Sequence, residues 1–357
     1  MDISAEIKSI KYTPHLCKSL SEISYSEFQL ALSEKASFIL NVDNNNKFAI
    51  SWWVSAKRTR SYPYARVYDT LRFSGKKVTI IPILKDEGKK GDRDFLQWDT
   101  VALMSLLGVY AIISYYEDAQ PSSRYKQKIT EQRFDIKHLR GAIVSLLSYQ
   151  SDALHWNLEQ IDKVGSIGQM ALESYESISR KLRIEMHSKT SAQKRINKLL
   201  MGKDVFMNFS RDLARKAQKR ESLTTHPKEF LTGKKAVLTI KNYLGGYYFF
   251  TADEAKIFGD KIFLAECKHS GNAILPSLED IKDGLMKMVL FTNLDKVNVK
   301  NKEYIPVPVL KLTSDMKFSK KLLRKSQIEH LQLLISEAKE NGFQVMINNV
   351  DLEKRDL

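Results

Sequence analysis

The sequence has few of the features that would place the protein in a membrane or outside the cell. Its only two cysteines, Cys17 and Cys267, lie far apart and offer no disulfide framework. Its first ten residues, MDISAEIKSI, carry acidic side chains where a secretory signal needs basic ones. The longest apolar run, residues 101–116, is interrupted by serines and a glycine and is too short and polar for a membrane span. We therefore expect a buried helix in this run and a cytoplasmic protein.

Several catalytic signatures are also missing. The chain has no G-x-x-x-x-G-K-[S/T] loop, so a nucleotide-driven motor has no support and no nucleotide cofactor is expected. It has no G-x-S-x-G motif, which removes the common serine-hydrolase signature. The seven histidines and two cysteines show no zinc-ligand spacing. These absences leave other hydrolases and binding proteins.

Positive charge is what the sequence has in excess. Lys and Arg number 57 against 42 Asp and Glu, giving a formal net charge of +15. Such a surface attracts polyanions. Most of the excess lies in residues 177–220, which hold 13 Lys and Arg against three Asp and Glu. A solvated charged face is the ordinary interpretation, but so uneven a segment favours contact with DNA phosphates; our candidates are Lys194, Arg195 and Lys198.

A second basic segment follows a predicted strand near residue 50. It interleaves cations with tyrosines, a composition suited to clasping phosphates and stacking or bonding to a nucleic-acid backbone. The alternative is an ordinary surface loop packed by its tyrosines. The cations are Lys57, Arg58, Arg60 and Arg66, and the tyrosines are Tyr62, Tyr64 and Tyr68.

Changes in pattern along the chain predict three regions. Residues 1–130 read as an α/β region that is a possible DNA-recognition part, and residues 131–232 read as a basic helical region. Residues 233–357 alternate strands and helices. Prolines within two predicted strands, Pro82 in one and Pro306 and Pro308 in the other, indicate edge strands or bulges.

The acidic segment from Asp86 to Asp99 holds five Asp and Glu after a predicted strand. Its Asp92-x-Asp94 resembles a fragment of a calcium loop, but the full ligand series is missing. We favour a polar turn with an aspartate as helix N-cap over a second metal site.

A predicted hairpin in the last region carries the chemistry. Two strands are joined by a turn at Gly259 and Asp260. Asp253 lies about six residues before the turn and Glu266 about six after it, so the two side chains are expected to face each other within about 5 Å. Lys268 lies two residues beyond Glu266 and projects from the same face.

Two facing carboxylates repel unless a proton or a cation lies between them. Oxygen ligands of this kind suit Mg²⁺, which binds through one or two carboxylates together with waters and phosphate oxygens. An ammonium nearby can orient or help deprotonate an attacking water and neutralise a phosphoryl transition state. The group therefore predicts phosphodiester hydrolysis; the alternative is a surface ion pair between Glu266 and Lys268.

With these residues and the order of predicted elements, the segment from Lys234 to Leu312 resembles the PD-(D/E)xK nuclease superfamily, which includes type II restriction endonucleases. Ala252 stands where the proline of the family's name would be. The resemblance implies an α/β (α+β) fold with a restriction-endonuclease-like core, a mixed central sheet flanked by helices. It implies Asp253 and Glu266 as Mg²⁺ ligands and Lys268 as a catalytic lysine.

Two further positions follow from the resemblance. A carboxylate on the first helix of the core assists the metal in some members, and a polar residue on the helix after E-x-K lies near the site. The candidates for the first are Glu173, Glu176 and Glu185, and those for the second are Lys282 and Lys287.

The sequence thus predicts a Mg²⁺-dependent endodeoxyribonuclease, a type II restriction enzyme acting on duplex DNA as a homodimer. The alternatives are a repair, recombination or mobile-element nuclease with the same core, and a catalytically inactive DNA-binding protein. The recognition sequence and the cut position are not readable from side chains alone, because groove docking depends on geometry.

Overall fold

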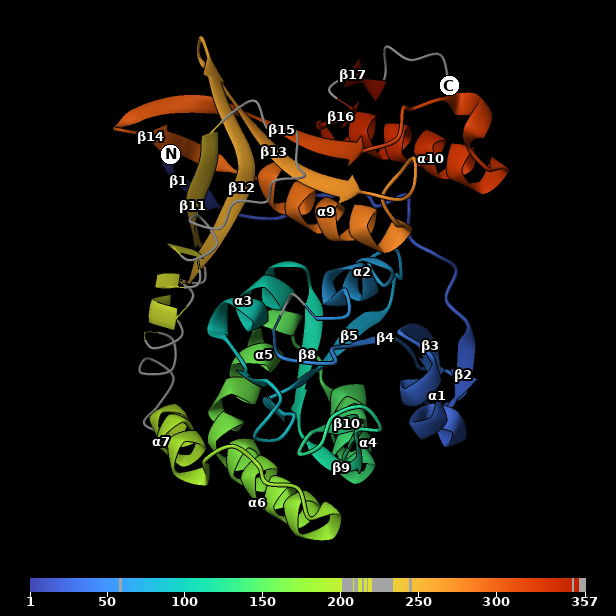
Figure 1. The fold of residues 1–357 in the computed structure, drawn as a ribbon, viewed down its shortest axis with the longest axis vertical. Coiled ribbons are helices and arrows are strands. Elements are labelled where there is room, and N and C mark those ends of the chain that lie inside the picture. Colours follow the sequence, from blue (N-terminus) through green and yellow to red (C-terminus); the bar gives the residue numbers. More distant parts are fainter. Residues whose placement is uncertain are drawn as a thin grey trace. The chain divides into compact units, whose positions relative to one another are not determined.

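The computed structural model describes residues 1–57, 60–200, 208, 211–213, 215, 216, 218, 219, 234–243, 246–348 and 350–352, and for 198–200 the backbone alone. The fold is mixed α/β and forms two compact units (Figure 1). The composite unit combines Met1–Lys18 with Arg211–Leu357, and the inserted unit is Ser19–Ser210. This division differs from the predicted regions 1–130, 131–232 and 233–357, because the first strand of the chain joins the C-terminal sheet.

The composite unit is built on one mixed sheet of eight strands with two main helices. The strands are β1 (Asp2–Ile7), β11 (Lys234–Asn242), β12 (Tyr247–Phe258), β13 (Lys261–Ser270), β14 (Asp295–Val299), β15 (Lys302–Ser314), β16 (Gln344–Ile347) and β17 (Val350–Asp351). The helices are α9 (Leu278–Phe291) and α10 (Lys325–Asn341), with a 3-10 turn, η2, at Lys320–Leu322. The strand order is β13-β12-β11-β1-β14-β15-β16-β17, and β13 also pairs with β15.

β1 closes this sheet into a ring. It pairs in parallel with β11 and antiparallel with β14. Because β13 and β15 also pair, in parallel, the strand pairings run from β13 through β12, β11, β1, β14 and β15 and return to β13. Apolar and polar residues alternate along β1, the pattern of a strand with one buried face. Ile3, Leu238 and Phe250 are neighbours in register on that face, and all are buried. In Figure 1 the blue N-terminal strand lies beside the C-terminal strands.

The two helices follow parallel strands of this sheet. α9 begins where Ser277 accepts a hydrogen bond from the Asp280 N–H at 3.1 Å. α10 begins at Lys325, after η2. It ends at Gly342, whose φ of 74° lies in the left-handed region that glycine adopts without strain.

The prolines of β15 show why the edge-strand interpretation was incomplete. β15 pairs with β13 from Ile305 to Ser314, and on its other side with β14 before Ile305 and with β16 from Val309. Pro306 and Pro308 lie in the short stretch between these two partners. On that side neither β14 nor β16 accepts a hydrogen bond from this stretch, so the missing proline N–H groups break no ladder bond. β15 therefore tolerates both prolines inside the sheet.

The inserted unit contains a five-stranded sheet in the order β2-β3-β4-β5-β8 and two small two-stranded sheets. Its strands are β2 (Glu22–Ser24), β3 (Ser37–Asn41), β4 (Lys47–Trp52), β5 (Lys76–Pro82), β6 (Leu84–Asp86), β7 (Arg93–Phe95), β8 (Val109–Ser114), β9 (Tyr116–Pro121) and β10 (Ile129–Phe134). Its helices are η1 (Tyr25–Glu27), α1 (Phe28–Glu34), α2 (Pro63–Tyr68), α3 (Trp98–Leu106), α4 (Ile136–Ser148), α5 (Ala153–Asp162), α6 (Val164–Leu182) and α7 (Lys189–Leu200).

Two predictions for this unit were wrong. The apolar run 101–116 was expected to be one helix, but it is the end of α3 followed by β8. Gly108, at φ +65°, makes the turn between them. β5 pairs with strands on both sides, so it is not an edge strand; Pro82 is its last residue. Periodicity cannot separate a buried strand from a buried helix in so apolar a segment.

Candidate active site

The hairpin of β12 and β13 brings Asp253 and Glu266 together. The ladder between the two strands pairs Glu254 with Ala265, so the next position places Asp253 opposite Glu266. Asp253 Oδ2 accepts the Cys267 N–H at 2.8 Å. Two facing carboxyl groups mark a position where a proton or a cation must offset their charge.

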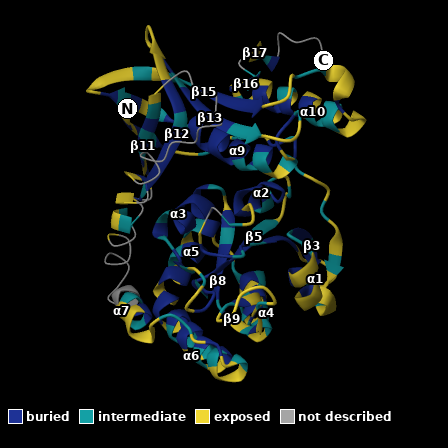
Figure 2. Ribbon diagram, in the orientation of Figure 1, coloured by how far each residue is buried: buried dark blue, intermediate teal, exposed yellow. Residues whose placement is uncertain are grey.

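Lys268 lies on the same face and links β13 to α9. Its Nζ is 3.1 Å from Glu266 Oε1 and donates to Asp283 Oδ2 at 2.7 Å. Gly284 permits this close approach, because a Cβ there would lie 3.3 Å from Lys268 Cε and 2.7 Å from Leu310 Cδ1. α9 is largely buried over this stretch (Figure 2). Asp283 therefore positions the lysine.

Lys287 is the second cation on Glu266. Its Nζ lies 2.6 Å from Glu266 Oε2 and donates to the Thr251 carbonyl at 3.1 Å. Asp283 and Lys287 are four residues apart and so lie on one face of α9. Sequence reasoning offered Lys287 with Lys282 but missed Asp283. The available signal was an acidic and a basic residue four positions apart, Asp283 and Lys287, in the helix after Glu266-x-Lys268.

The charges of the site fix its protonation. Burial opposes ionisation of Glu266, but the ammonium groups of Lys287 and Lys268 and the hydrogen bonds outweigh it and lower its pKa to about 2. Burial also opposes the charge of Lys268, but Glu266 and Asp283 raise its pKa well above the usual value. At neutral pH Glu266 is a carboxylate and Lys268 an ammonium.

A similar ion pair occupies the opposite face of the sheet. Lys311 Nζ lies 2.6 Å from Glu254 Oε2, and Lys256 Nζ lies 3.1 Å from Glu254 Oε1. Glu254 and Lys311 are both buried. Because the side chains of a strand alternate between faces, this pair provides a matched control for the Glu266 site.

The carboxylates proposed for the first helix lie in the inserted unit. Gln169 donates to Glu173 at 3.0 Å, Lys189 pairs with Glu176, and Lys89 pairs with Glu185 at 2.7 Å. Each is thus engaged within that unit. In the described part of the chain no group of three or more His, Cys, Asp or Glu side chains could hold a metal ion. Any metal site at Asp253 and Glu266 therefore has two acidic ligands.

Two of the predicted DNA-contacting arginines are held inside the inserted unit. Arg60 bonds Glu87 at 2.9 Å and Asp94 at 2.8 Å, and it pairs with Asp92. The Arg66 guanidinium lies 4.4 Å from the centre of the Trp52 ring and donates to its carbonyl. Contacts with DNA by these side chains stay predictions.

The other predicted DNA contacts divide by exposure. Arg195 lies 4.1 Å from the centre of the Phe95 ring, and burial lowers its pKa to about 10. Lys57 and Lys194 are exposed. Arg58 and the Lys198 side chain lie outside the described residues. Of the candidates whose side chains the structure describes, Lys57 and Lys194 are open to solvent or a phosphate.

The acidic segment 86–99 contains no aspartate N-cap. Gln97 holds that position at α3, and Asp99 lies in its first turn. Glu87 is buried and bonded by Lys85, Lys128 and Arg60. Burial raises its pKa, but the hydrogen bonds and charges of these cations outweigh burial and lower it to about 2. The segment is a polar turn held by salt bridges.

We expect Arg60→Ala to lower the stability of the inserted unit by about 2 kcal/mol, because it leaves two buried carboxylates short of a cation. All four tryptophans lie in this unit, so tryptophan fluorescence in urea follows its unfolding alone. Lys57→Ala, an exposed cation in the same loop, is the control and should change nothing. Unchanged stability in Arg60→Ala, with weaker DNA binding, would instead support the DNA-contact prediction.

Comparisons of the chain with family models, with curated proteins and with solved structures gave no match. Across the residues that the structure describes, no helix has both the length and the apolar character needed to cross a membrane.

Proposed function

We propose that this protein is a Mg²⁺-dependent endodeoxyribonuclease of the PD-(D/E)xK type. The observation that carries the proposal is the strand register that places Asp253 opposite Glu266, with Lys268 Nζ 3.1 Å from Glu266 Oε1. Carboxylates from adjacent strands and one ammonium on a single face are the groups that phosphodiester hydrolysis needs.

The topology around these residues supports the proposal. β11, β12 and β13 form an antiparallel meander, α9 and β14 follow, and β15 returns parallel to β13. The resemblance to restriction endonucleases implies three strands, a helix and a strand; β14 is an additional strand between α9 and β15. The basic surface adds attraction for a polyanionic substrate.

The donor set fits Mg²⁺. Asp253 and Glu266 occupy facing positions of the hairpin, and a magnesium ion held by two carboxylates would leave room for waters and phosphate oxygens. When bound, Mg²⁺ makes its water easier to deprotonate and offsets charge on the phosphate. Lys268, held by Asp283, neutralises charge developing on the phosphoryl oxygens. Its raised pKa favours this role over that of a general base.

Within this class we propose a type II restriction enzyme that cuts duplex DNA as a homodimer. One site cuts one strand, so a double-strand break implies two copies of the chain. The alternative of a repair, recombination or mobile-element nuclease uses the same groups and differs in the pattern of products.

Incubating the protein with supercoiled plasmid and Mg²⁺ tests the function. We expect cleavage that stops in EDTA, and Lys268→Met should reduce its rate by about 10²–10³-fold. Lys256→Met is the matched control, because Lys256 pairs with Glu254 two residues away as Lys268 pairs with Glu266.

The pattern of cleavage products distinguishes the alternative functions. Discrete fragments support a restriction enzyme, and diffuse degradation supports a repair-type nuclease. Binding that weakens with salt and is never followed by cleavage would replace the proposal with a non-catalytic DNA-binding protein.

A further inference from the structure

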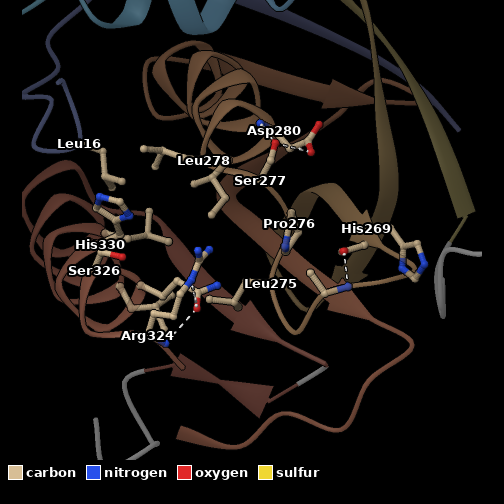
Figure 3. A pocket seen from close by; sticks show the side chains of 16 residues that line it. Leu16, His269, Leu275, Pro276, Ser277, Leu278, Asp280, Arg324, Ser326 and His330 are labelled. Atoms are coloured by element: carbon tan, nitrogen blue, oxygen red, sulfur yellow. Dashed lines mark hydrogen bonds between the residues drawn. The ribbon is translucent and has the colours of Figure 1, made fainter. Parts of the chain in front are cut away.

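A pocket of about 440 Å³ lies in the composite unit (Figure 3). The end of β13, the start of α9 and the first turns of α10 form its walls. His269 and Ser270, which line it, directly follow Lys268 in the chain. The pocket therefore lies near the carboxyl ends of the parallel strands β13 and β15.

The lining combines an apolar floor with cationic and polar groups. The floor comes from Leu275, Pro276, Leu278 and Leu331. Arg324 and His330 of the α10 region contribute polar groups on one side, and His269 at the end of β13 lies apart from them (Figure 3). A few polar groups over an apolar surface are the composition of a small-molecule site.

Two acidic groups lie near this pocket. Asp280 accepts from the Ser277 hydroxyl at 2.7 Å at the start of α9. Asp315 Oδ1 lies 3.6 Å from His269 Nε2. The Arg324 side chain reaches only its neighbour Gln327, at 3.5 Å. The guanidinium thus keeps most of its donors for a ligand.

A basic segment, residues 315–325, begins and ends at residues that line or contact the pocket. At one end the Ser314 hydroxyl donates to the Ala273 carbonyl at 2.6 Å, and Asp315 N–H donates to the Ser270 carbonyl at 3.3 Å. At the other end Arg324 lines the pocket. The cations of the segment are exposed, and no acidic residue lies among them: Lys317, Lys320, Lys321, Arg324 and Lys325.

From these observations we infer that the pocket binds one nucleotide, with its base on the apolar floor and its phosphate toward Arg324 and His330. An apolar surface of this size takes a flat ring, and Arg binds phosphate through paired donors. A purely apolar ligand would make no contact with Arg324 and His330, and a simple anion would not cover the apolar floor.

Two sources can supply this ligand. A free mononucleotide is one. A nucleotide unit of a DNA strand is the other, and that source rests on the proposed nuclease function.

Calorimetric titration in EDTA tests the pocket without cleavage. Thymidine 5′-monophosphate should bind, and inorganic phosphate should bind at least about tenfold more weakly, since it lacks the base. Arg324→Gln should lower the affinity for the nucleotide by about tenfold, because one charge-assisted contact is lost. Leu278→Trp should block nucleotide binding, because the larger side chain fills the apolar floor. Lys339→Gln, an exposed cation in the last turn of the same helix, should bind as the wild type does.

A short single-stranded oligonucleotide distinguishes the sources. If it competes with the mononucleotide and Arg324→Gln weakens it equally, the ligand is a unit of a strand; if it does not compete, the ligand is a free nucleotide. Equal binding of phosphate and nucleotide, or binding of neither, would overturn the inference. If the protein cleaves DNA but the pocket binds no nucleotide, the inference about the pocket fails and the nuclease proposal stands. If the pocket binds the nucleotide but the protein cleaves no DNA, only the nuclease proposal fails.

Discussion

Replacing Glu266 with glutamine is expected to lower the rate of plasmid cleavage by about 10³-fold, since the amide removes a negative metal ligand and the charge that holds Lys268 and Lys287. The same change should lower the free energy of unfolding of the composite unit by about 3–5 kcal/mol, the usual cost of breaking a buried ion pair on one side. Initial cleavage rates and chemical denaturation followed by circular dichroism measure the two effects.

Glu254→Gln is the control that separates chemistry from folding. It also breaks a buried pair, Glu254 with Lys311, on the other face of the sheet. We expect a similar loss of stability with cleavage retained. Equal loss of cleavage in both variants, at a temperature where both are folded, would show that the Glu266 cluster is structural.

Acid should remove the stability difference between the wild type and Glu266→Gln. The pKa of Glu266 is lowered from its ordinary value of 4.5 to about 2. A lowered carboxyl pKa stabilises the fold fully above the unfolded value, and the contribution is lost as pH falls through the folded value. The two proteins should therefore differ most above pH 5 and converge toward pH 2.

Replacing Lys287 with methionine is expected to tighten Mg²⁺ binding by about tenfold or more. The ammonium lies 2.6 Å from Glu266 Oε2 and competes with any second cation for that oxygen. Coulomb repulsion over a few ångströms in a partly buried site is worth several kcal/mol, so tenfold is a modest expectation. Without metal, the variant should lose about 3 kcal/mol of stability, and excess Mg²⁺ should restore part of it.

Isothermal titration of Mg²⁺ at pH 7.5 measures this effect. Lys311→Met is the control: it removes a buried ammonium from Glu254 on the opposite face and should leave Mg²⁺ affinity unchanged. Weaker binding in Lys287→Met would contradict the competition and would mean that this lysine holds Glu266 in the geometry that the metal needs.

The local part of the site was predictable from the sequence. A turn at Gly259 and Asp260 between two strands sets the register, and register alone places Asp253 opposite Glu266. The two-residue spacing places Lys268 on the same face as Glu266. These relations depend on neighbours in one hairpin, where strand geometry leaves little freedom.

The partners from α9 were only half predictable. Helical spacing allows Asp283 and Lys287 to share a face, but not which face meets β13. That depends on where the connection between β13 and α9 lays the helix, and on Gly284, whose missing side chain lets the helix approach Lys268. Similarly, the charge of Arg60 was visible in the sequence, but its carboxylate partners come from separate strands and turns.

The sequence by itself determined the facing carboxylates, the lysine beside them, the basic surface and most strands and helices of the C-terminal half, because each follows from short-range periodicity or composition. Tertiary structure alone decided that β1 joins the C-terminal sheet, that the run after Gly108 is a strand, and that the Lys287 ammonium bonds the Glu266 carboxylate. Each of these depends on contacts between segments distant in the chain, where burial and pairing outweigh local preference.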